Sequence, residues 1–135
     1  MKTPKEVDKV AFIEIQNKHI LSTKSKGKTK YYIPGGKREK GESDEQTLIR
    51  EIAEELSVAI IPNTAAYIGS FSAQSDEAEK GIRVLMTCYT AKYIGHLKAN
   101  SEIEEIRWLN YNNLDIISEV DKKIFQFLHE KGILI

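Results

Sequence analysis

The spacing of apolar and polar side chains predicts several β-strands along this chain. Period-two alternation and short apolar runs predict strands over residues 10–16, 19–25, 29–33, 66–71, 82–94 and 102–109. Segment 82–94 is the longest, and its near-continuous apolar character predicts a central strand that is buried on both faces. Pro34, Gly35 and Gly36 are expected to end the third strand, because proline has no N–H to donate to a neighbouring strand. Polar loops are expected over 75–81 and 95–101.

A helical period follows the third predicted strand. Ser43 and Gln46 have the spacing of a capping box, so a helix is expected to begin at Asp44. The apolar side chains that share one side of this helix are Leu48, Ile49, Ile52, Ala53 and Leu56. The charged side chains expected on the opposite side are Arg50, Glu51, Glu54 and Glu55.

A second helix is expected near the end of the chain, where Ser118 can cap its start and Gly132 can end it. Its apolar stripe consists of Val120, Ile124, Phe127 and Leu128, and core packing explains this stripe most simply. Strands and helices are interleaved without the regular rhythm of parallel βαβ units. The pattern therefore predicts a mixed α+β layer structure that forms one domain over residues 1–135.

The composition is that of a globular protein with balanced charge. Hydrophobic residues make up 41% and charged residues 30%, and the 20 acidic and 20 basic side chains cancel. No bulk field therefore recruits a nucleic acid polymer or an anionic membrane, and a polyanionic ligand must be held locally. No apolar run is long enough to cross a bilayer, and Cys88 is the only cysteine. A cytoplasmic location is the default expectation.

The acidic side of the first helix is the strongest candidate for chemistry. Glu51, Glu54 and Glu55 lie one turn apart and repel one another, which costs an isolated helix roughly a few tenths of a kcal/mol per pair. A divalent cation would compensate this repulsion, since Mg²⁺ takes oxygen ligands from a few carboxylates and completes its shell with water and phosphate. Arg50 is a second source of positive charge. The alternative interpretation is a solvated acidic surface.

The segment from Gly36 to Val58 resembles the Nudix box, Gly-x5-Glu-x7-Arg-Glu-U-x-Glu-Glu-x-Gly-U, in which U is aliphatic. The matching residues are Gly36, Glu42, Arg50, Glu51, Ile52, Glu54, Glu55 and Val58. Ser57 stands where the motif has glycine, and serine costs about 1 kcal/mol relative to glycine if this position is left-handed. The resemblance, in particular to small MutT-like members, implies an α/β/α sandwich with a mixed sheet between helices.

The resemblance also implies a Mg²⁺-dependent hydrolase, with Mn²⁺ as a possible substitute. The metal ligands would be Glu51, Glu54 and Glu55, and the carbonyl oxygen of Gly36 could reach the same ion. Arg50 would orient the carboxylates through charge-assisted hydrogen bonds. The catalytic set that the resemblance implies in the box is thus Arg50, Glu51 and Glu54.

In several members of the Nudix family the general base lies outside the box, in the loop before a tryptophan-bearing strand. Glu102 lies six residues before Trp108 at a similar position and is the expected base, with Glu104 and Glu105 close behind. The alternative is that these three are solvated loop acids. Glu42, the first glutamate of the box, is expected to tie its loop to the helix or to act as an outer metal ligand.

A nucleotide, or another nucleoside diphosphate-linked molecule, is the substrate that the resemblance implies. The expected reaction converts a (d)NTP to a (d)NMP and pyrophosphate through attack of a metal-activated water on phosphorus. Lys24 and Tyr31 are candidates for substrate binding, although such residues more often solubilise a hairpin or fill a core. Residues 71–74 match neither the family's marker for ADP-ribose nor its marker for dinucleoside polyphosphates. The alternative is a Nudix-fold sensor without turnover, and family members are often homodimers.

Overall fold

The computed structural model describes residues 6–75 and 81–135, so most of the predicted loop 75–81 lies outside the described residues. The strands are β1 (Glu6–Phe12), β2 (Ile15–Gln16), β3 (His19–Ser25), β4 (Gly35–Lys37), β5 (Ala59–Ile60), β6 (Ala66–Gln74), β7 (Arg83–Thr90), β8 (Tyr93–Ile94) and β9 (Ile103–Leu109). The helices are α1 (Asp44–Leu56), α2 (Glu119–Glu130) and the short 3-10 helix η1 (Tyr111–Ile116).

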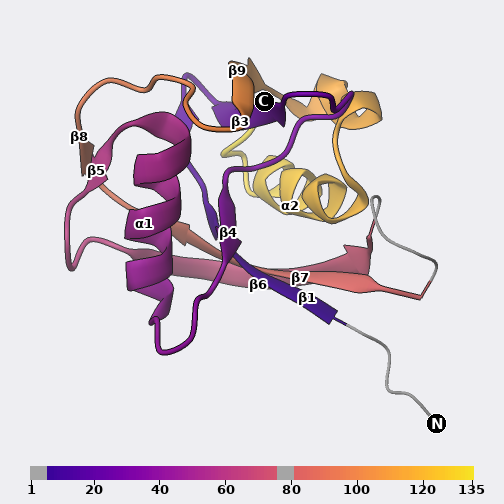
Figure 1. Cartoon of the computed structure of the whole chain (residues 1–135). Helices are drawn as coiled ribbons and strands as arrows, with labels where there is room; N and C mark the ends of the chain where they lie inside the picture. Colours follow the sequence, from indigo (N-terminus) through magenta and orange to yellow (C-terminus); the bar gives the residue numbers. More distant parts are fainter. Residues whose placement is uncertain (1–5, 76–80) are drawn as a thin grey trace, which may run out of the picture.

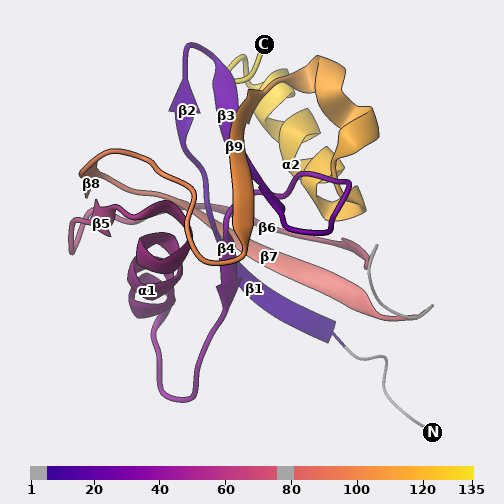
Figure 2. The same cartoon turned by 45° about the horizontal axis from the view of Figure 1, so that its top comes forward.

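The strands form several sheets, of which the largest contains both parallel and antiparallel pairs (Figure 1). The largest has the order β4-β1-β7-β6, in which β1 and β7 are parallel and the other pairs are antiparallel. A second, antiparallel sheet has the order β2-β3-β9, and β5 pairs with β8. Two views place β4 between α1 and α2 (Figure 1, Figure 2). This arrangement confirms the predicted α+β class with mixed sheet between helices.

Strand β1 separates two hydrophobic clusters, because alternate side chains of a strand point to opposite faces. On one face Val10 and Phe12 pack in the cluster that contains the apolar stripe of α1. On the other face Ala11 and Ile13 belong to the cluster that contains the stripe of α2. The two helices are therefore held on opposite faces of a strand that lies between β4 and β7.

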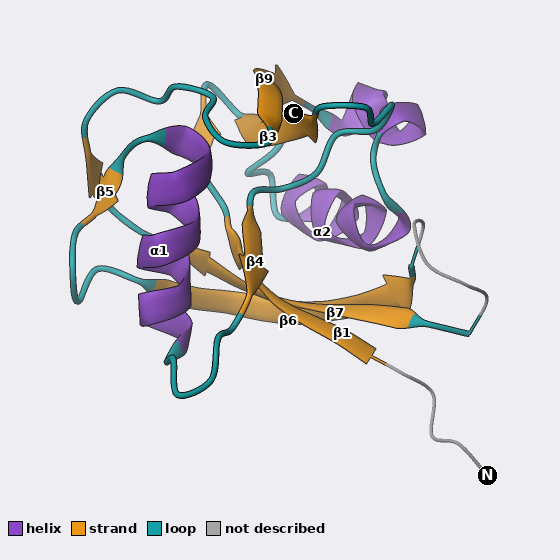
Figure 3. Cartoon of the chain, viewed as in Figure 1, coloured by secondary structure: helices purple, strands orange, loops and turns teal. Residues whose placement is uncertain are grey.

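The strand predictions were partly wrong. Segment 29–33 is not a strand, since only isolated bridges form at Tyr31 and Tyr32, and Figure 3 shows the connection to β4 as loop. Gly35 and Gly36 do not end a strand but begin β4, which pairs with β1. The predicted strand 82–94 is divided, because the chain leaves β7 at Thr90 and its last residues pair with β5 instead. Strand β7 is central as predicted.

The helix boundaries agree closely with the predictions. Ser43 caps α1 through a complete capping box, and the predicted second helix starts after Ser118. Within α1, however, Ala53 is exposed while Glu55 is buried, so the apolar face was misplaced by part of a turn at its C-terminal end. Within α2, Phe125 is fully buried and replaces the half-buried Phe127 in the expected stripe. Neither helix among the described residues is long and apolar enough to span a membrane.

Candidate active site

Two consecutive glycines allow β4 to lie close to both β1 and α1. Gly35 has a φ of +148°, and a Cβ atom on it would lie 2.0 Å from the carbonyl oxygen of Val10. A Cβ atom on Gly36 would lie 2.3 Å from the carboxyl carbon of Glu51. A side chain at position 35 would therefore separate β4 from β1, and a side chain at position 36 would separate β4 from the acidic helix. The Gly35 N–H donates a 3.0 Å hydrogen bond to the Glu55 carboxylate across this narrow gap.

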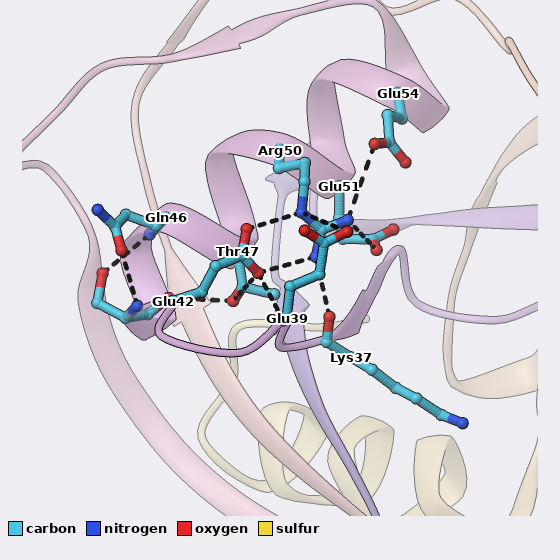
Figure 4. Close-up of polar contacts among 9 residues, drawn as sticks. Lys37, Glu39, Glu42, Gln46, Thr47, Arg50, Glu51 and Glu54 are labelled. Atoms are coloured by element: carbon cyan, nitrogen blue, oxygen red, sulfur yellow. Dashed lines mark hydrogen bonds and ion pairs between the residues drawn. The ribbon is translucent and has the colours of Figure 1, made fainter.

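Arg50 is the centre of the polar contacts on α1 (Figure 4). Its guanidinium donates two hydrogen bonds to Glu42, of 2.7 and 2.9 Å, and one of 2.8 Å to Glu51. It also donates a hydrogen bond of 3.0 Å to the carbonyl oxygen of Lys37 on β4, and it lies 3.8 Å from the Glu54 carboxylate. Arg50, and secondarily the Glu39 N–H, lower the pKa of Glu42 to about 2. The contacts therefore support orientation by Arg50 and place Glu42 as the tie between loop and helix.

Glu55 is a buried carboxyl group at the end of the acidic face. Its residue exposure is 7%, and desolvation by this burial raises the pKa of Glu55 to about 8. The hydrogen bond from Gly35 opposes that rise, and repulsion from Glu51 and Glu102 adds to it. Burial likewise raises the pKa of Glu51, against the effect of Arg50. Two neighbouring acids are thus held where their negative charges are poorly solvated.

A cavity of about 220 Å³ opens beside these acids. Its lining near α1 consists of Lys9, Gly35, Gly36, Glu55 and Glu102. Its lining further along consists mainly of Thr23, Ser25, Lys28, Tyr32, Ile33, Gln74, Val84, Met86, Ser118 and Asp121. Strands from two sheets, the loop after β3 and the start of α2 therefore share one cavity with the acidic helix. The contrast between its acidic end and its mixed polar and apolar end suits a ligand with two chemically different parts.

Among the three loop acids, Glu102 alone lines this cavity. Glu104 forms a 3.1 Å ion pair with Lys24, and Glu105 accepts a short hydrogen bond from the Tyr31 hydroxyl. The Ser101 hydroxyl, and secondarily the backbone, lower the pKa of Glu102. Glu102 is therefore the loop acid that is both ionised at neutral pH and directed to the cavity.

The chain segment before Glu102 is fastened to the end of α1. The N–H groups of Lys98 and Asn100 donate hydrogen bonds of 2.9 and 3.0 Å to the carbonyl oxygens of Leu56 and Glu55. These carbonyls have no partner within the helix, so the loop satisfies them. The same contacts fix Glu102 relative to the acidic face of α1.

Lys24 and Tyr31, the two residues expected to bind substrate, do not line the cavity. Lys24 is held by Glu104 and by the carbonyl oxygen of Lys28. Tyr31 is 7% exposed and packs in the hydrophobic cluster of α2. Lys24 is thus engaged in an ion pair with Glu104, and Tyr31 in core packing.

Lys9, Tyr32 and Asp121 are among the cavity-lining residues to which sequence reasoning gave no role in the site. Asp121 is 1% exposed and accepts a 2.9 Å hydrogen bond from the Ile33 N–H. Nothing in the local pattern distinguishes it from a solvated acid in the first turn of a helix. An acid at the third helical position, next to an apolar stripe, is the one signal that could have indicated Asp121 as a buried residue.

The carboxylates of α1 are not gathered into a ready-made metal centre. Within the described residues, no three His, Cys, Asp or Glu side chains are close enough to hold an ion. Glu51 is bound by Arg50, Glu54 is largely exposed, and Glu55 is bound by the Gly35 N–H. The donor set still fits Mg²⁺, which binds through one or two carboxylates and completes its shell with water and substrate phosphate. A cation there would also relieve the repulsion at Glu55.

Ser57 ends α1 in the left-handed conformation, with φ 64° and ψ 22°. Its N–H donates a 3.2 Å hydrogen bond to the carbonyl oxygen of Ala53. The backbone thus adopts the conformation for which the motif's glycine is suited, despite the serine side chain. The departure from the motif therefore lies at the end of the helix, where the serine side chain is exposed.

Comparisons with known proteins agree with this geometry. An archaeal protein of Methanocaldococcus jannaschii named ADP-ribose pyrophosphatase is 29% identical over 116 residues, which cover 84% of this chain and 67% of that protein. The MutT protein of Methanosarcina mazei has a similar structure, with a TM-score of 0.75 at 17% identity over 98% of this chain and 99% of that one. The Escherichia coli ORF135 protein has a TM-score of 0.73 at 23% identity, over 95% and 92% of the two chains.

The family model described as the NUDIX domain matches residues 5–129. This match includes every strand and nearly all of α2, as well as the glycine pair, the Arg50 contacts and the acidic helix face. Members of this family are pyrophosphohydrolases that typically use divalent metals and act on nucleoside diphosphate-linked compounds. The chain therefore belongs to the Nudix hydrolase family.

Proposed function

We propose that this chain hydrolyses a phosphoanhydride bond of a nucleoside triphosphate, with release of a nucleoside monophosphate and pyrophosphate. The observation that carries the proposal is the buried Glu55, which lies beside Glu51 at the end of a cavity shared with Glu102. An acidic end for metal and phosphates, next to an enclosed end for a nucleoside, is what this reaction requires.

The acids of α1 are the proposed metal ligands. Glu51, Glu54 and Glu55 would hold Mg²⁺ or Mn²⁺, with the carbonyl oxygen of Gly36 beside them. When bound, the metal neutralises phosphate charge and lowers the pKa of a bound water. Arg50 would keep Glu51 in position through the hydrogen bond that it donates.

Glu102 is the proposed general base. It lines the same cavity as Glu55, and its carboxylate is ionised at neutral pH because its pKa is lowered. It would accept the proton of the attacking water as that water approaches phosphorus. The anchoring of residues 98–100 to α1 supports this role, since it holds the base relative to the proposed metal ligands.

The far end of the cavity is the proposed site of the nucleoside. The whole cavity has a volume of about 220 Å³, below the roughly 300–1,000 Å³ of pockets that enclose drug-sized ligands, so it would bury only part of a nucleotide. Tyr32 offers an aromatic surface there, and Asp121 offers a carboxylate that accepts hydrogen bonds. A base with adjacent N–H donors, guanine first, pairs best with such a carboxylate.

ADP-ribose is the second candidate substrate, since the similar protein of Methanocaldococcus jannaschii carries the name ADP-ribose pyrophosphatase. Residues 71–74 lack the family's marker for that substrate. The products separate the two candidates. A triphosphate yields pyrophosphate, whereas ADP-ribose yields AMP and ribose 5-phosphate.

The test is product analysis with a panel of nucleotides and ADP-ribose, with Mg²⁺ or Mn²⁺ and with chelator. Glu54→Gln is compared with Glu130→Gln, which changes an exposed acid on α2. Metal-dependent turnover that is lost in Glu54→Gln and kept in Glu130→Gln supports the proposal. A nucleotide that raises the melting temperature without any turnover would establish the sensor instead.

A further inference from the structure

Lys9 is a charged side chain on a strand that has no free edge. Strand β1 lies between β4 and β7, where Lys9 is paired in register with Lys37 and Met86. Lysines on edge strands often prevent association of sheets, but that role does not apply to an interior strand. Lys9 is half-buried and lines the cavity. Its position therefore calls for another explanation.

The surroundings of Lys9 are acidic but do not hold it. The Lys9 side chain forms no hydrogen bond or ion pair with any residue in the described part of the chain. It is close enough to Glu55 to exert an electrostatic attraction, and Glu102 lines the same end of the cavity. The ammonium group thus lies near carboxylates without the fixed contact of a structural salt bridge.

The charge distribution of the cavity gives this lysine a use. A phosphate chain that approaches Glu55 and Glu102 is repelled by both carboxylates, and a metal held by the acids of α1 would offset part of this repulsion. Lysine is a compact positive charge that suits phosphate oxygens, and a partly buried site screens it less than bulk water does. Lys28 also lines the cavity but lies on the loop after β3, away from the central strand.

We propose that Lys9 binds the phosphate chain of the substrate, as a cation that lines the cavity near the acids of α1. This inference rests on the proposed function, and it deepens that function by adding a substrate-binding residue outside the Nudix box. Lys9 would contribute to substrate affinity, and Lys37, its partner in register, would not. Lys37 is exposed, does not line the cavity, and its side chain points away from the acids in Figure 4.

The test measures binding of a GTP analogue in which a methylene group replaces the oxygen between the α- and β-phosphates. Calorimetry with Mg²⁺ compares the native chain with Lys9→Met, Lys9→Arg and Lys37→Met. Lys9→Met is expected to weaken binding about tenfold, because a charge-assisted contact is lost. Lys9→Arg keeps the charge and is expected to stay within about threefold of the native chain, and Lys37→Met within about twofold. The weakening in Lys9→Met is expected to shrink at high salt.

The outcomes separate this inference from the proposed function. Equal binding by Lys9→Met and Lys37→Met overturns the role of Lys9, even if the native chain hydrolyses nucleotides. A native chain that neither binds the analogue nor hydrolyses any nucleotide overturns the proposed function itself. Melting temperatures confirm that each variant is folded, and Lys9→Gln replaces Lys9→Met if the latter does not fold.

Discussion

Each of the two long helices buries one carboxylate against the same short segment of chain. Glu55 of α1 accepts a hydrogen bond from the Gly35 N–H, and Asp121 of α2 accepts one from the Ile33 N–H. Both acids are more than nine-tenths buried, and both line the same cavity. Only Pro34 separates the two donors, so the helices face each other across this segment.

The surroundings of the two acids differ in charge. Glu55 lies near Glu51 and Glu102, whose repulsion adds to the desolvation that raises its pKa. Asp121 lines a part of the cavity that is also lined by the hydroxyl-bearing residues Thr23, Tyr32 and Ser118 and by Lys28. An acid among acids requires a cation, whereas an acid among hydroxyl groups suits hydrogen-bond donors of a ligand. Neighbouring groups, rather than burial alone, therefore determine what a buried carboxylate can bind.

The largest expected effect is that of Glu55→Gln. Loss of a metal-binding carboxylate is expected to lower kcat roughly a hundredfold or more. The metal-free variant is expected to be more stable than the native chain at pH 8, because glutamine removes a charge that burial disfavours. A raised pKa of about 8 means that this destabilisation is absent below the ordinary pKa and grows as the pH rises toward 8. Denaturant unfolding of the variant and the native chain in EDTA at pH 5 and pH 8 measures this difference in unfolding free energy. The same difference at both pH values would contradict the prediction.

Arg50→Lys tests whether activity depends on the hydrogen bonds by which Arg50 holds the acids of α1 in position. Lysine cannot reproduce the two hydrogen bonds to Glu42 together with those to Glu51 and the Lys37 carbonyl oxygen. Activity is expected to fall about 10- to 100-fold, as is typical when groups that orient metal ligands are changed. Steady-state kinetics at saturating Mg²⁺ provide the measurement. Arg83→Lys, at an exposed position, is the control.

Asp121→Asn changes the other buried acid and is expected to alter selectivity rather than chemistry. The amide keeps an acceptor for the Ile33 N–H but replaces the second acceptor by a donor. The preference for GTP over ATP in kcat/KM is expected to fall about tenfold, while kcat for the better substrate changes little. An unchanged preference, equal to that of the exposed control Asp115→Asn, would remove Asp121 from base recognition.

The smallest expected effect is on the end of α1. Ser57→Gly removes a Cβ atom from a left-handed residue and is expected to stabilise the fold by about 0.5–1 kcal/mol. Activity is expected to stay within about twofold, because the positions of the acids do not depend on this side chain. Thermal unfolding measures the gain. Ser57→Ala keeps the Cβ atom and should show none of it.

Local signals located the parts of the site that lie close together in sequence. The capping box placed the start of α1 at Asp44, and the spacing of the box residues placed Arg50 among the acids. The same reasoning did not reveal that Lys24 forms an ion pair with Glu104 or that Tyr31 packs in a hydrophobic cluster, because both contacts join segments that are distant in sequence. It failed also for β4, since glycines have no side chain to reveal that they pair with β1.

The sequence by itself determined the Nudix box, the two capped helices and the mixed α+β class, because these depend on residues within a few turns of one another. Only the tertiary structure decided that Glu55 is buried and that Glu102 lines the cavity while Glu104 and Glu105 do not. It also brought Lys9 and Asp121 to that cavity from opposite ends of the chain. The physical reason is that burial and electrostatic surroundings arise from contacts between distant segments, which no local pattern contains.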